Sequence, residues 1–402
     1  MATREVPRTG QNDLALQPDE RWPFYADDEI EAAAEVLRSG KVNQWTGPEV
    51  SAFETSCTAR FGGSHGIALA NGSVALDLAL LALEIGPGDE VVVTPRTFVA
   101  SAFCVVLAGA TPVFADVDVD SGNITPESIE RVLTERTRAV IPVHLAGWPA
   151  DMPGIMKLAS RHHLLVIEDC AQAHGATIDG RSVGSFGNAA TFSFCQDKII
   201  STGGEGGFVS FQDREAWDWA RSFKDHGKNW QKVESTGGPP GEFKWLHDQV
   251  GTNWRLTGPQ AAIGLRQLEK LDRWHAKRHA NAQVWIDALS EVNGVRVPRP
   301  APHLRHALYK LYFQLDAPPG EARRLIGEIL RRATDEGLRL FSGSCPEVYL
   351  EKAFEGLPRP DCPNARQLGE TSLMVEVHPT LRHDLLEKRA ERLSTIIRDV
   401  IG

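Results

Sequence analysis

Short apolar runs alternate with longer helical stretches over the first half of the chain. Seven runs have the length and composition of buried strands: GIALAN (66–71), EVVVTP (90–95), TPVFADV (111–117), AVIPVHL (139–145), LLVIEDC (164–170), ATFSFC (190–195) and GGFVSF (206–211). The first five are separated by segments long enough for a crossover or a helix. We therefore expect an α/β fold with a mainly parallel sheet covered on both faces. The last two runs follow closely, so the end of the sheet can include an antiparallel strand.

The helical segments carry start and stop signals. A helix begins near Asp27 and ends at Gly40. Its apolar face consists of Ile30, Ala33, Ala34 and Leu37. Residues 73–83 form another helix, and Thr125-Pro126 opens a third. A helical pattern without a breaker then runs from Pro259 to about Ser290, which suits a connection between domains.

These patterns predict three parts: an N-terminal arm (1–25), a large domain (26–272), and a small C-terminal domain (273–402) entered by the long helix. The small domain is expected to be α+β, with a strand at 307–315 and helices at 321–336 and 381–400. Residues 228–250 are polar and rich in glycine and proline. We expect a long loop there, and long loops inside compact domains are usually functional or mobile.

Composition narrows the functional classes. The formal net charge of the 402-residue chain is -10, which argues against a nucleic-acid partner. No run of about 18 apolar residues predicts a membrane span, and the first residues lack the apolar stretch of a secretory signal. The six cysteines show no C-x-x-C spacing, and no histidine cluster completes a zinc set, so no metal is expected. Unpaired thiols fit a reducing, cytoplasmic location.

Two motifs follow predicted strands. Asn71-Gly72-Ser73 lies where a strand ends and a helix begins, so its free N–H groups can bind an anion, although Ser73 can equally be a helix cap. Glu168-Asp169 ends another strand at its carboxyl edge, where open α/β sheets bind ligands. An acid there can cap a helix, ligate a metal, or pair with the protonated pyridine nitrogen of pyridoxal phosphate (PLP).

Lys198 lies between an apolar strand and the glycine-rich run 203–207. Most lysines are solvated surface charges. Apolar neighbours and a nearby cationic ring can instead keep an amine unprotonated and nucleophilic. The order G-x-x-x-x-G-K-[ST] does not occur, which excludes a Walker A nucleotide loop. Further along, the segment 251–256 (GTNWRL) places Asn253 beside Arg255, where the pair can bind a phosphate or a carboxylate.

Taken together and in order, these segments resemble the DegT/DnrJ/EryC1/StrS family of sugar aminotransferases, which have the fold-type-I PLP architecture. The resemblance extends from Trp22 to Pro379. It is carried by GPEVSAFE (47–54), ANGSVALDLAL (70–80), GDEVVVTPRTFVAS (88–101), IPVHLAG (141–147), IEDCAQAHGA (167–176), VGSFGNAATFSF (183–194), Lys198 with GGEGG (203–207), DHGK (225–228), GTNWRL (251–256) and QAAIGLRQLEKLD (260–272).

The resemblance implies a role for each matching residue. Lys198 would hold PLP as a Schiff base and later move the proton, and Asp169 would pair with the pyridinium nitrogen. Gln172 would contact the ring hydroxyl, and Phe98 would stack on the ring. The cofactor phosphate would be held by Gly72, Ser73, Ser193 and, from the neighbouring subunit, Asn253. The last role implies a homodimer whose sites are built from two chains.

The implied reaction moves an amino group from glutamate or glutamine, through pyridoxamine phosphate, to a keto-sugar, nucleotide-linked in the leading case, or to a keto-cyclitol. The product would be an amino sugar for a surface glycan or a secondary metabolite. Arg255 is our candidate for the donor carboxylate or a substrate anion. Other candidate substrate residues are Trp45, Arg96, His226 and His378.

Two alternatives stay open, and three departures bear on the substrate. A bifunctional dehydrating enzyme of the aminoshikimate type would keep the lysine, whereas sugar 3-dehydratases carry histidine at the position of Lys198. A non-enzymatic regulatory protein on this fold would be expected to have lost Lys198 or Asp169. Arg96, the sequence Cys195-Gln196-Asp197 and Trp148 depart from the usual family pattern near the pocket.

Overall fold

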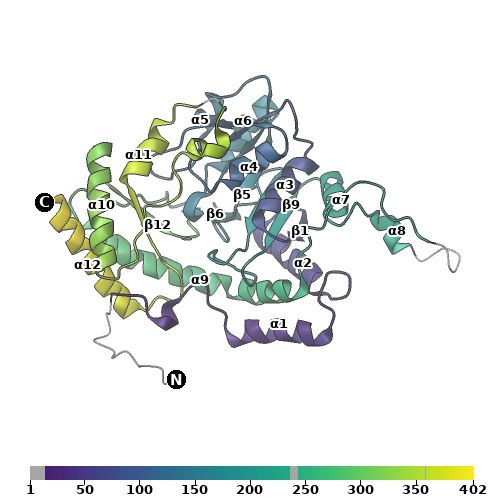
Figure 1. The fold of residues 1–402 in the computed structure, drawn as a ribbon, viewed down its shortest axis with the longest axis horizontal. Coiled ribbons are helices and arrows are strands. Elements are labelled where there is room, and N and C mark those ends of the chain that lie inside the picture. The colour runs from purple at the N-terminus through teal and green to yellow at the C-terminus, as the bar shows by residue number, and fades with distance from the viewer. Residues whose placement is uncertain (1–13, 236–242, 358) are drawn as a thin grey trace, which may run out of the picture.

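A seven-stranded sheet organises the larger part of the computed structural model, which describes residues 14–235, 243–357 and 359–402 (Figure 1). The strand order is β1-β9-β8-β5-β4-β2-β3. The bounds are β1 (His65–Leu69), β2 (Glu90–Val93), β3 (Thr111–Phe114), β4 (Thr137–Ile141), β5 (Leu165–Asp169), β8 (Ala189–Ser193) and β9 (Gly207–Phe211). Strand β9 is antiparallel to both β1 and β8, and the other pairs are parallel. The predicted mainly parallel sheet is therefore confirmed.

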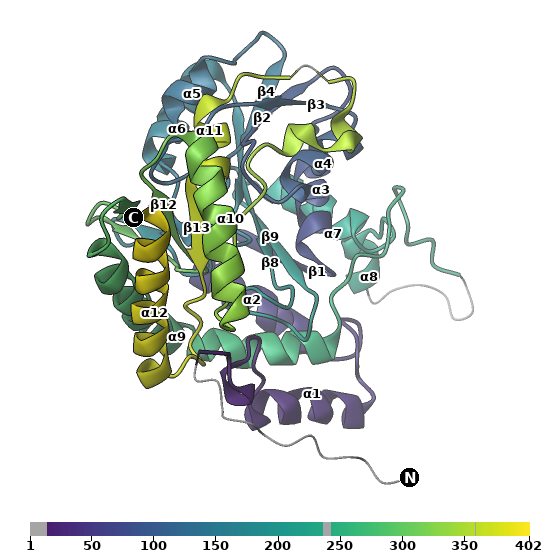
Figure 2. The same ribbon diagram turned by 60° about the vertical axis from the view of Figure 1, so that its left-hand side comes forward.

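Helices cover the sheet on both sides. Their bounds are α2 (Glu49–Phe61), α3 (Gly72–Ala82), α4 (Ala100–Leu107), α5 (Pro126–Glu130), α6 (Met152–His162) and α7 (Arg214–Phe223). Figure 2 shows α3, α4 and α7 on one side of the sheet and α5 and α6 on the other. Because both faces are covered, the strands carry apolar residues on both faces, and all four residues of β2 are buried.

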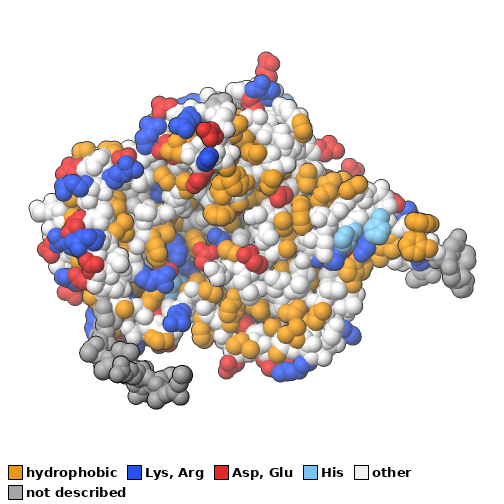
Figure 3. Space-filling view, viewed as in Figure 1, with side chains coloured by type: hydrophobic (Ala, Val, Ile, Leu, Met, Phe, Trp, Pro, Cys, Tyr) orange, Lys and Arg blue, Asp and Glu red, His pale blue; other side chains and the backbone are white. Residues whose placement is uncertain are grey.

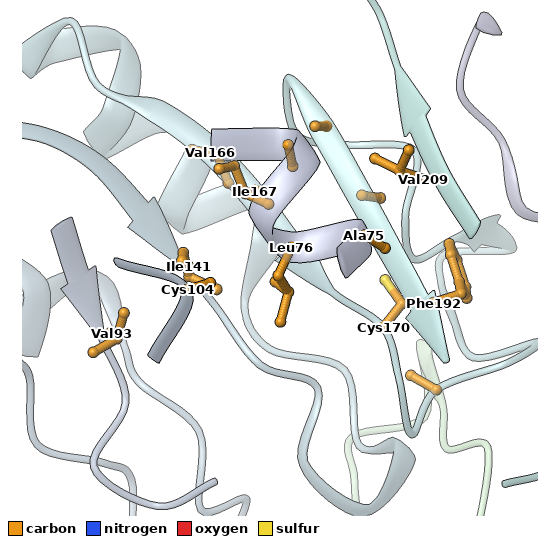
Figure 4. Packing of buried hydrophobic residues seen from close by; sticks show 14 of the residues in the cluster. Ala75, Leu76, Val93, Cys104, Ile141, Val166, Ile167, Cys170, Phe192 and Val209 are labelled. Atoms are coloured by element: carbon orange, nitrogen blue, oxygen red, sulfur yellow. The ribbon is translucent and has the colours of Figure 1, made fainter. Parts of the chain in front are cut away.

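The largest buried apolar cluster joins the strands to α3. Figure 4 shows Leu76 of α3 close to the strands, near Ile141 and Ile167. Leu76 is 4% exposed and the two isoleucines are fully buried. This packing fixes α3, and with it the turn that precedes the helix, against the carboxyl ends of the strands.

A second apolar cluster lies around a smaller sheet of β10 (Val295–Arg296), β12 (Leu311–Leu315) and β13 (Ser372–Val375). It includes residues of α10 (Pro319–Asp335) and α12 (His383–Ile401). The long helix α9 (Gly258–Ser290) contributes Leu271 to the first cluster and Leu289 to the second. The expected connecting helix is therefore present, while the domain boundary at 272 stays a prediction.

Some elements differ from the expectation. The strand expected from 307 begins at Leu311, because Leu308 has a φ of 53° and the Ala307 and Tyr309 amides donate to Gly147 and Ala146 carbonyls. Several short elements were not predicted: β6 (Thr177–Ile178), β7 (Arg181–Ser182), β11 (Leu304–Arg305), α11 (Pro363–Thr371) and, in the expected loop, α8 (Trp230–Glu234). Residues 236–242 of that loop lie outside the described part.

Helix α1 (Asp27–Ser39) has the expected bounds, and Gly40 ends it in the left-handed conformation with a φ of 68°. Its expected apolar face is not the buried one, since Ile30 is 56% and Leu37 62% exposed. The helix packs on α9 through Val36 and Glu29 instead. Glu29 lies 3.2 Å from the Lys270 amine of α9. The apolar face of α1 is therefore left uncovered in the single chain.

The segment before α1 is anchored to the C-terminal helix. Residues 1–13 of the expected arm lie outside the described part, but Glu20 is fully buried and accepts two hydrogen bonds from the Arg389 guanidinium, at 2.8 and 2.6 Å. Burial alone would raise the pKa of Glu20, but Arg389 and the Gln17 and Arg382 amides hold it below its usual value. In the described residues, no helix has the length and apolar character needed to cross a bilayer.

We expect Arg389→Met to destabilise the protein by about 3–5 kcal/mol, because Glu20 would remain buried without a counter-charge. Urea unfolding at neutral pH would measure the loss. The matched control is Arg382→Met, since Arg382 forms an exposed pair with Asp384 and should change stability by at most about 1 kcal/mol.

The double variant Glu20→Gln/Arg389→Met should recover much of the stability, because it removes both charges. The contribution of Glu20 is present above its ordinary pKa and is lost as the pH falls through the lower value of the folded protein. The stability advantage of the wild type over the double variant should therefore shrink as the pH falls below about 4.5. Equal losses for Arg389→Met and Arg382→Met would contradict this account.

Candidate active site

One large cavity, here called the central pocket, lies at the edge of the sheet where the parallel strands end. Its volume is about 880 Å³. Seven of the predicted cofactor residues line it: Gly72, Ser73, Phe98, Asp169, Gln172, Ser193 and Lys198. They come from segments up to 126 positions apart that meet because parallel strands deliver their carboxyl ends to one edge.

The N-terminus of α3 forms one wall of the central pocket. Asn71 caps the helix by accepting a hydrogen bond from the Val74 amide at 3.0 Å. A Cβ atom on Gly72 would lie 2.6 Å from the Ser193 Cβ, so only glycine fits in this position. The amides of the first turn, together with the hydroxyls of Ser73 and Ser193, therefore form a site suited to an anion.

The two acids at the end of β5 have different functions because neighbouring strand residues point to opposite faces. Asp169 lines the central pocket and is 5% exposed. One of its oxygens accepts from the Ser101 hydroxyl at 2.8 Å and the other from the Ala171 amide at 3.1 Å. These bonds fix the carboxylate in position. The nearby Gln172 is also fixed, since its side-chain oxygen accepts from the Ala146 amide at 2.6 Å.

Glu168 faces away from the pocket, beside His144 and Cys170, and the ligand atoms of the three lie within 4.8 Å of one another. Although this spacing resembles a metal site, hydrogen bonds already occupy the carboxylate. It accepts from the amides of Gly184, Phe186 and Gly187 at 2.7–2.8 Å and lies 3.2 Å from the His144 ring. Burial raises the pKa of the Cys170 thiol. The cluster is thus a structural network that supports β5.

Lys198 lies in the turn after β8, with its amine 3.8 Å from Asp197 and 4.9 Å from the centre of the Tyr309 ring. The Tyr309 hydroxyl donates to Asp197. Burial would raise the pKa of Asp197, but the charge of Lys198 and this hydroxyl hold it below its usual range. The indole N–H of Trp22 donates to the Lys198 carbonyl at 2.9 Å, so the lysine is fixed through both its side chain and its backbone.

Most of the remaining predicted residues gather in a second place, here called the Asp225 cluster. It consists of Asp225, Lys228, Arg255, Asn253, His226 and Trp45. The fully buried Asp225 carboxylate accepts from the Arg255 guanidinium and lies 3.3 Å from the Lys228 amine. That amine lies 3.7 Å from the centre of the Trp45 ring. None of these residues lines the central pocket of the same chain.

An exposed segment with the apolar residues Phe243 and Trp245, here called the apolar arm, continues from the Asp225 cluster. The segment that carries α8 projects from the body (Figure 1), and Figure 3 shows hydrophobic side chains near its end. Phe243 is 73% exposed and Trp245 80%, and their rings pack against each other with centres 4.9 Å apart. Large apolar side chains exposed in this way are typical of a surface that another protein covers.

The last two predicted substrate residues are buried elsewhere. His378 stacks on Trp22, and its ring nitrogen bonds the Thr380 hydroxyl at 2.9 Å. Burial lowers the pKa of His378. Arg96 is 2% exposed and lines a smaller, separate cavity. Neither residue lines the central pocket.

The sequence reasoning missed Tyr309, Tyr312 and Ser101, which all line the central pocket. The tyrosines come from the small domain, far along the chain from Lys198. A weak signal existed, because the chain has four tyrosines and two of them occur within LYKLY (308–312). Ser101 gave no signal, since only the fold brings it to Asp169.

The fold and the central pocket define a class of protein. A mainly parallel seven-stranded sheet with a small α+β unit beside it, and a lysine and an aspartate that line one pocket at the strand ends, is the arrangement of fold-type-I PLP aminotransferases. The model of the DegT/DnrJ/EryC1/StrS aminotransferase family matches residues 24–394. The chain belongs to this family, whose members are sugar aminotransferases that use PLP.

Similar proteins support this assignment. An aminotransferase from Psychrobacter cryohalolentis, solved by X-ray crystallography, has 49% identity and a TM-score of 0.90 over 95% of this chain and 99% of its own. The UDP-N-acetyl-3-dehydro-alpha-D-glucosamine 3-aminotransferase of Acidithiobacillus ferrooxidans is 38% identical over 88% of both chains. The 3-amino-5-hydroxybenzoate synthase of Amycolatopsis mediterranei is 33% identical over 85% of this chain and 88% of its own.

We expect Gly72→Ala to destabilise the protein by about 1–3 kcal/mol, because the new methyl group would overlap Ser193. Thermal or urea unfolding would measure the loss. The double variant Gly72→Ala/Ser193→Gly should recover part of the lost stability, since it removes the Ser193 side chain that the new methyl group would overlap. Gly320→Ala is the matched control: nothing lies within 4 Å of its added Cβ. A Gly72→Ala protein as stable as this control would refute the close approach.

Proposed function

We propose that this chain is a PLP-dependent aminotransferase that moves an amino group from glutamate or glutamine to a keto-sugar, nucleotide-linked in the leading case, or to a keto-cyclitol. The observation that carries the proposal is that Lys198 and Asp169 line one pocket, beside an anion site at the N-terminus of α3. The family and the named sugar aminotransferase relative support the choice of substrate class. A cytoplasmic location remains part of the prediction.

The residues of the central pocket fit the three chemical parts of PLP. Gly72, Ser73 and Ser193 would hold the phosphate, where a side chain on Gly72 would fill the cradle. Phe98 is 67% exposed and lines the pocket, so its ring is free to stack on the cofactor ring. Asp169 offers a fixed carboxylate to the pyridine nitrogen.

The chain's own residues then supply proton transfer and charge control. When bound, PLP supplies an electron sink for the donor's α-carbon once that carbon loses its proton. The amine of Lys198 would accept that proton at Nζ and deliver it to the aldehyde carbon of the cofactor. Asp169 would keep a proton on the pyridine nitrogen by its negative charge. The Asp197 carboxylate, held by Tyr309, would keep the Lys198 amine within the pocket while it is free.

Lys198→Ala should abolish the visible absorption of bound PLP and lower amine transfer by at least about 10²–10⁴-fold, because the proton carrier is lost. Absorption spectra before and after borohydride, with labelled glutamate as donor, would measure both effects. The control is Lys277→Ala, which changes a half-buried lysine of α9 outside the central pocket and should keep both. If the wild-type protein takes up no PLP under saturating conditions, the proposed function is refuted.

The Asp225 cluster supports a homodimer with shared active sites. Its predicted substrate and cofactor residues do not line the central pocket of their own chain, and Asn253 and His226 are exposed. The apolar arm beside them and the apolar face of α1 are uncovered. We propose that the cluster of one chain completes the pocket of its partner, with Asn253 at the cofactor phosphate and Arg255, Trp45 and His226 toward the substrate.

A complementation experiment tests the shared site. Lys198→Ala and Asn253→Ala remove groups that the proposal places on opposite chains of one site. Each variant alone should be impaired, but an equimolar mixture after subunit exchange should regain about a quarter of wild-type activity, since half the dimers carry one intact site. The mixture can instead show only the activity expected from the amount of Asn253→Ala protein that it contains. That result would show that each site is built from a single chain.

The similarity to a 3-amino-5-hydroxybenzoate synthase supports a second candidate function, in which dehydration accompanies amine chemistry and Lys198 is kept. A panel of keto-sugar nucleotides and keto-cyclitols, with labelled glutamate, separates the two candidates. Label in the product without loss of water supports the aminotransferase. Formation of an aromatic amine from a cyclic precursor, with no turnover of any keto-sugar, would favour the second candidate.

A further inference from the structure

A smaller cavity, here called the Arg96 cavity, lies between the two buried apolar clusters. Its volume is about 110 Å³, which exceeds several times the roughly 10–15 Å³ needed for one water molecule. Residues of the large domain (Arg96, Trp148) and of the C-terminal part (His306, Tyr312) line it. Tyr312 also lines the central pocket, so its side chain borders both spaces.

The Arg96 guanidinium is buried in this cavity without a counter-ion. Arg96 is 2% exposed, and two of its three nitrogens, Nε and Nη1, have no hydrogen-bond partner. Its guanidinium lies over the Tyr312 ring, whose centre is 5.3 Å from the guanidinium carbon. Arginine remains charged in proteins, and a buried charge without a partner is strongly unfavourable. The geometry therefore requires something polar in the cavity.

The cavity lining offers hydrogen-bond donors and no free buried acid among the described residues. Asp120, at the exposed end of the cavity, is paired with Arg296. His306 accepts from the Leu308 amide at Nδ1, 2.8 Å away, and burial lowers its pKa to about 3. Its ring is thus neutral and carries its proton on Nε2, as a donor. Donors around an unpaired cation match an anion with several acceptor oxygens.

We propose that Arg96 binds a small carboxylate in the Arg96 cavity. A carboxylate neutralises the guanidinium and accepts several hydrogen bonds in a planar arrangement that arginine matches. The space is too small for a nucleoside diphosphate but is adequate for a short carboxylic acid. The carboxylate has two possible sources, the dicarboxylic donor or its keto acid, and a free monocarboxylate. Naming the donor as the source rests on the proposed function.

The test uses glutarate, which carries both carboxylates of glutamate but has no amine or carbonyl and so does not react. Calorimetric titration of the purified protein, in a chloride-free buffer of constant ionic strength, should show binding. Arg96→Met should weaken the affinity at least about 10-fold, as expected for the loss of a charge-assisted hydrogen bond. Arg96→Lys keeps the charge but not the planar donors. Its affinity for glutarate should lie between those of the wild type and Arg96→Met.

The matched control is Arg299→Met, since Arg299 is an exposed arginine that lines the same cavity. It should change the affinity by less than about 2-fold, because exposed charges interact weakly. Arg96→Met should also unfold at a midpoint no lower than that of the wild type in anion-free buffer, since it replaces an unpaired buried charge with an apolar side chain. An equal loss of affinity for Arg299→Met overturns the proposal, and so does an unchanged affinity for Arg96→Met.

Parallel titrations identify the source of the carboxylate. Glutarate and 2-oxoglutarate binding at least about 10-fold more tightly than acetate supports the donor, while equal affinities support a free monocarboxylate. Chloride binding as tightly as all of these overturns the carboxylate assignment. Failure of the site and failure of the proposed function are distinguishable: Arg96-dependent glutarate binding without any amine transfer refutes the function alone, and amine transfer with Arg96-independent glutarate binding refutes the site alone.

Discussion

The contact on which the active site depends is the close approach of α3 to the ends of β8 and β9. A Cβ on Gly207 would lie 2.1 Å from the Asn71 carbonyl oxygen, and one on Gly72 would lie 2.6 Å from the Ser193 Cβ. Backbone therefore packs directly on backbone there. This contact brings the amides at the start of α3 to the same edge as Asp169, and it lets β9 return between β1 and β8 after the Lys198 turn.

The large sheet could be predicted from the sequence because its strands are buried on both faces. Each strand therefore appears as a largely apolar run. The predicted cofactor residues of the central pocket lie at the ends of such runs or shortly after them, which is why their convergence could be expected from strand direction alone. The apolar face of α1 was a different case. Its periodicity predicted the helix correctly, but packing on α9 selected Val36 and Glu29, and periodicity contains no information about the neighbour.

Contacts between distant segments could not be predicted from the sequence. Tyr309 reaches Lys198 because the small domain folds back onto the large one, with Leu308 at a positive φ and Arg278 of α9 donating to the Leu308 carbonyl at 3.0 Å. Burial lowers the pKa of Arg278 to about 9. By donating to backbone carbonyls, the buried Arg278 holds the segment of Leu308 and Tyr309 in place. Neither this arrangement nor the unpaired Arg96 has a local pattern, since both depend on which residues surround the guanidinium in three dimensions.

The anchored segment before α1 has a consequence for biosynthesis. Trp22 bonds the Lys198 carbonyl, and Glu20 bonds Arg389 in the last helix of the chain. Glu20 therefore needs a partner that is made 369 residues later, so the lysine turn acquires this support only after α12 has left the ribosome. Until then the large sheet can assemble, but Lys198, the proposed cofactor lysine, lacks the backbone support that Trp22 gives it in the finished fold.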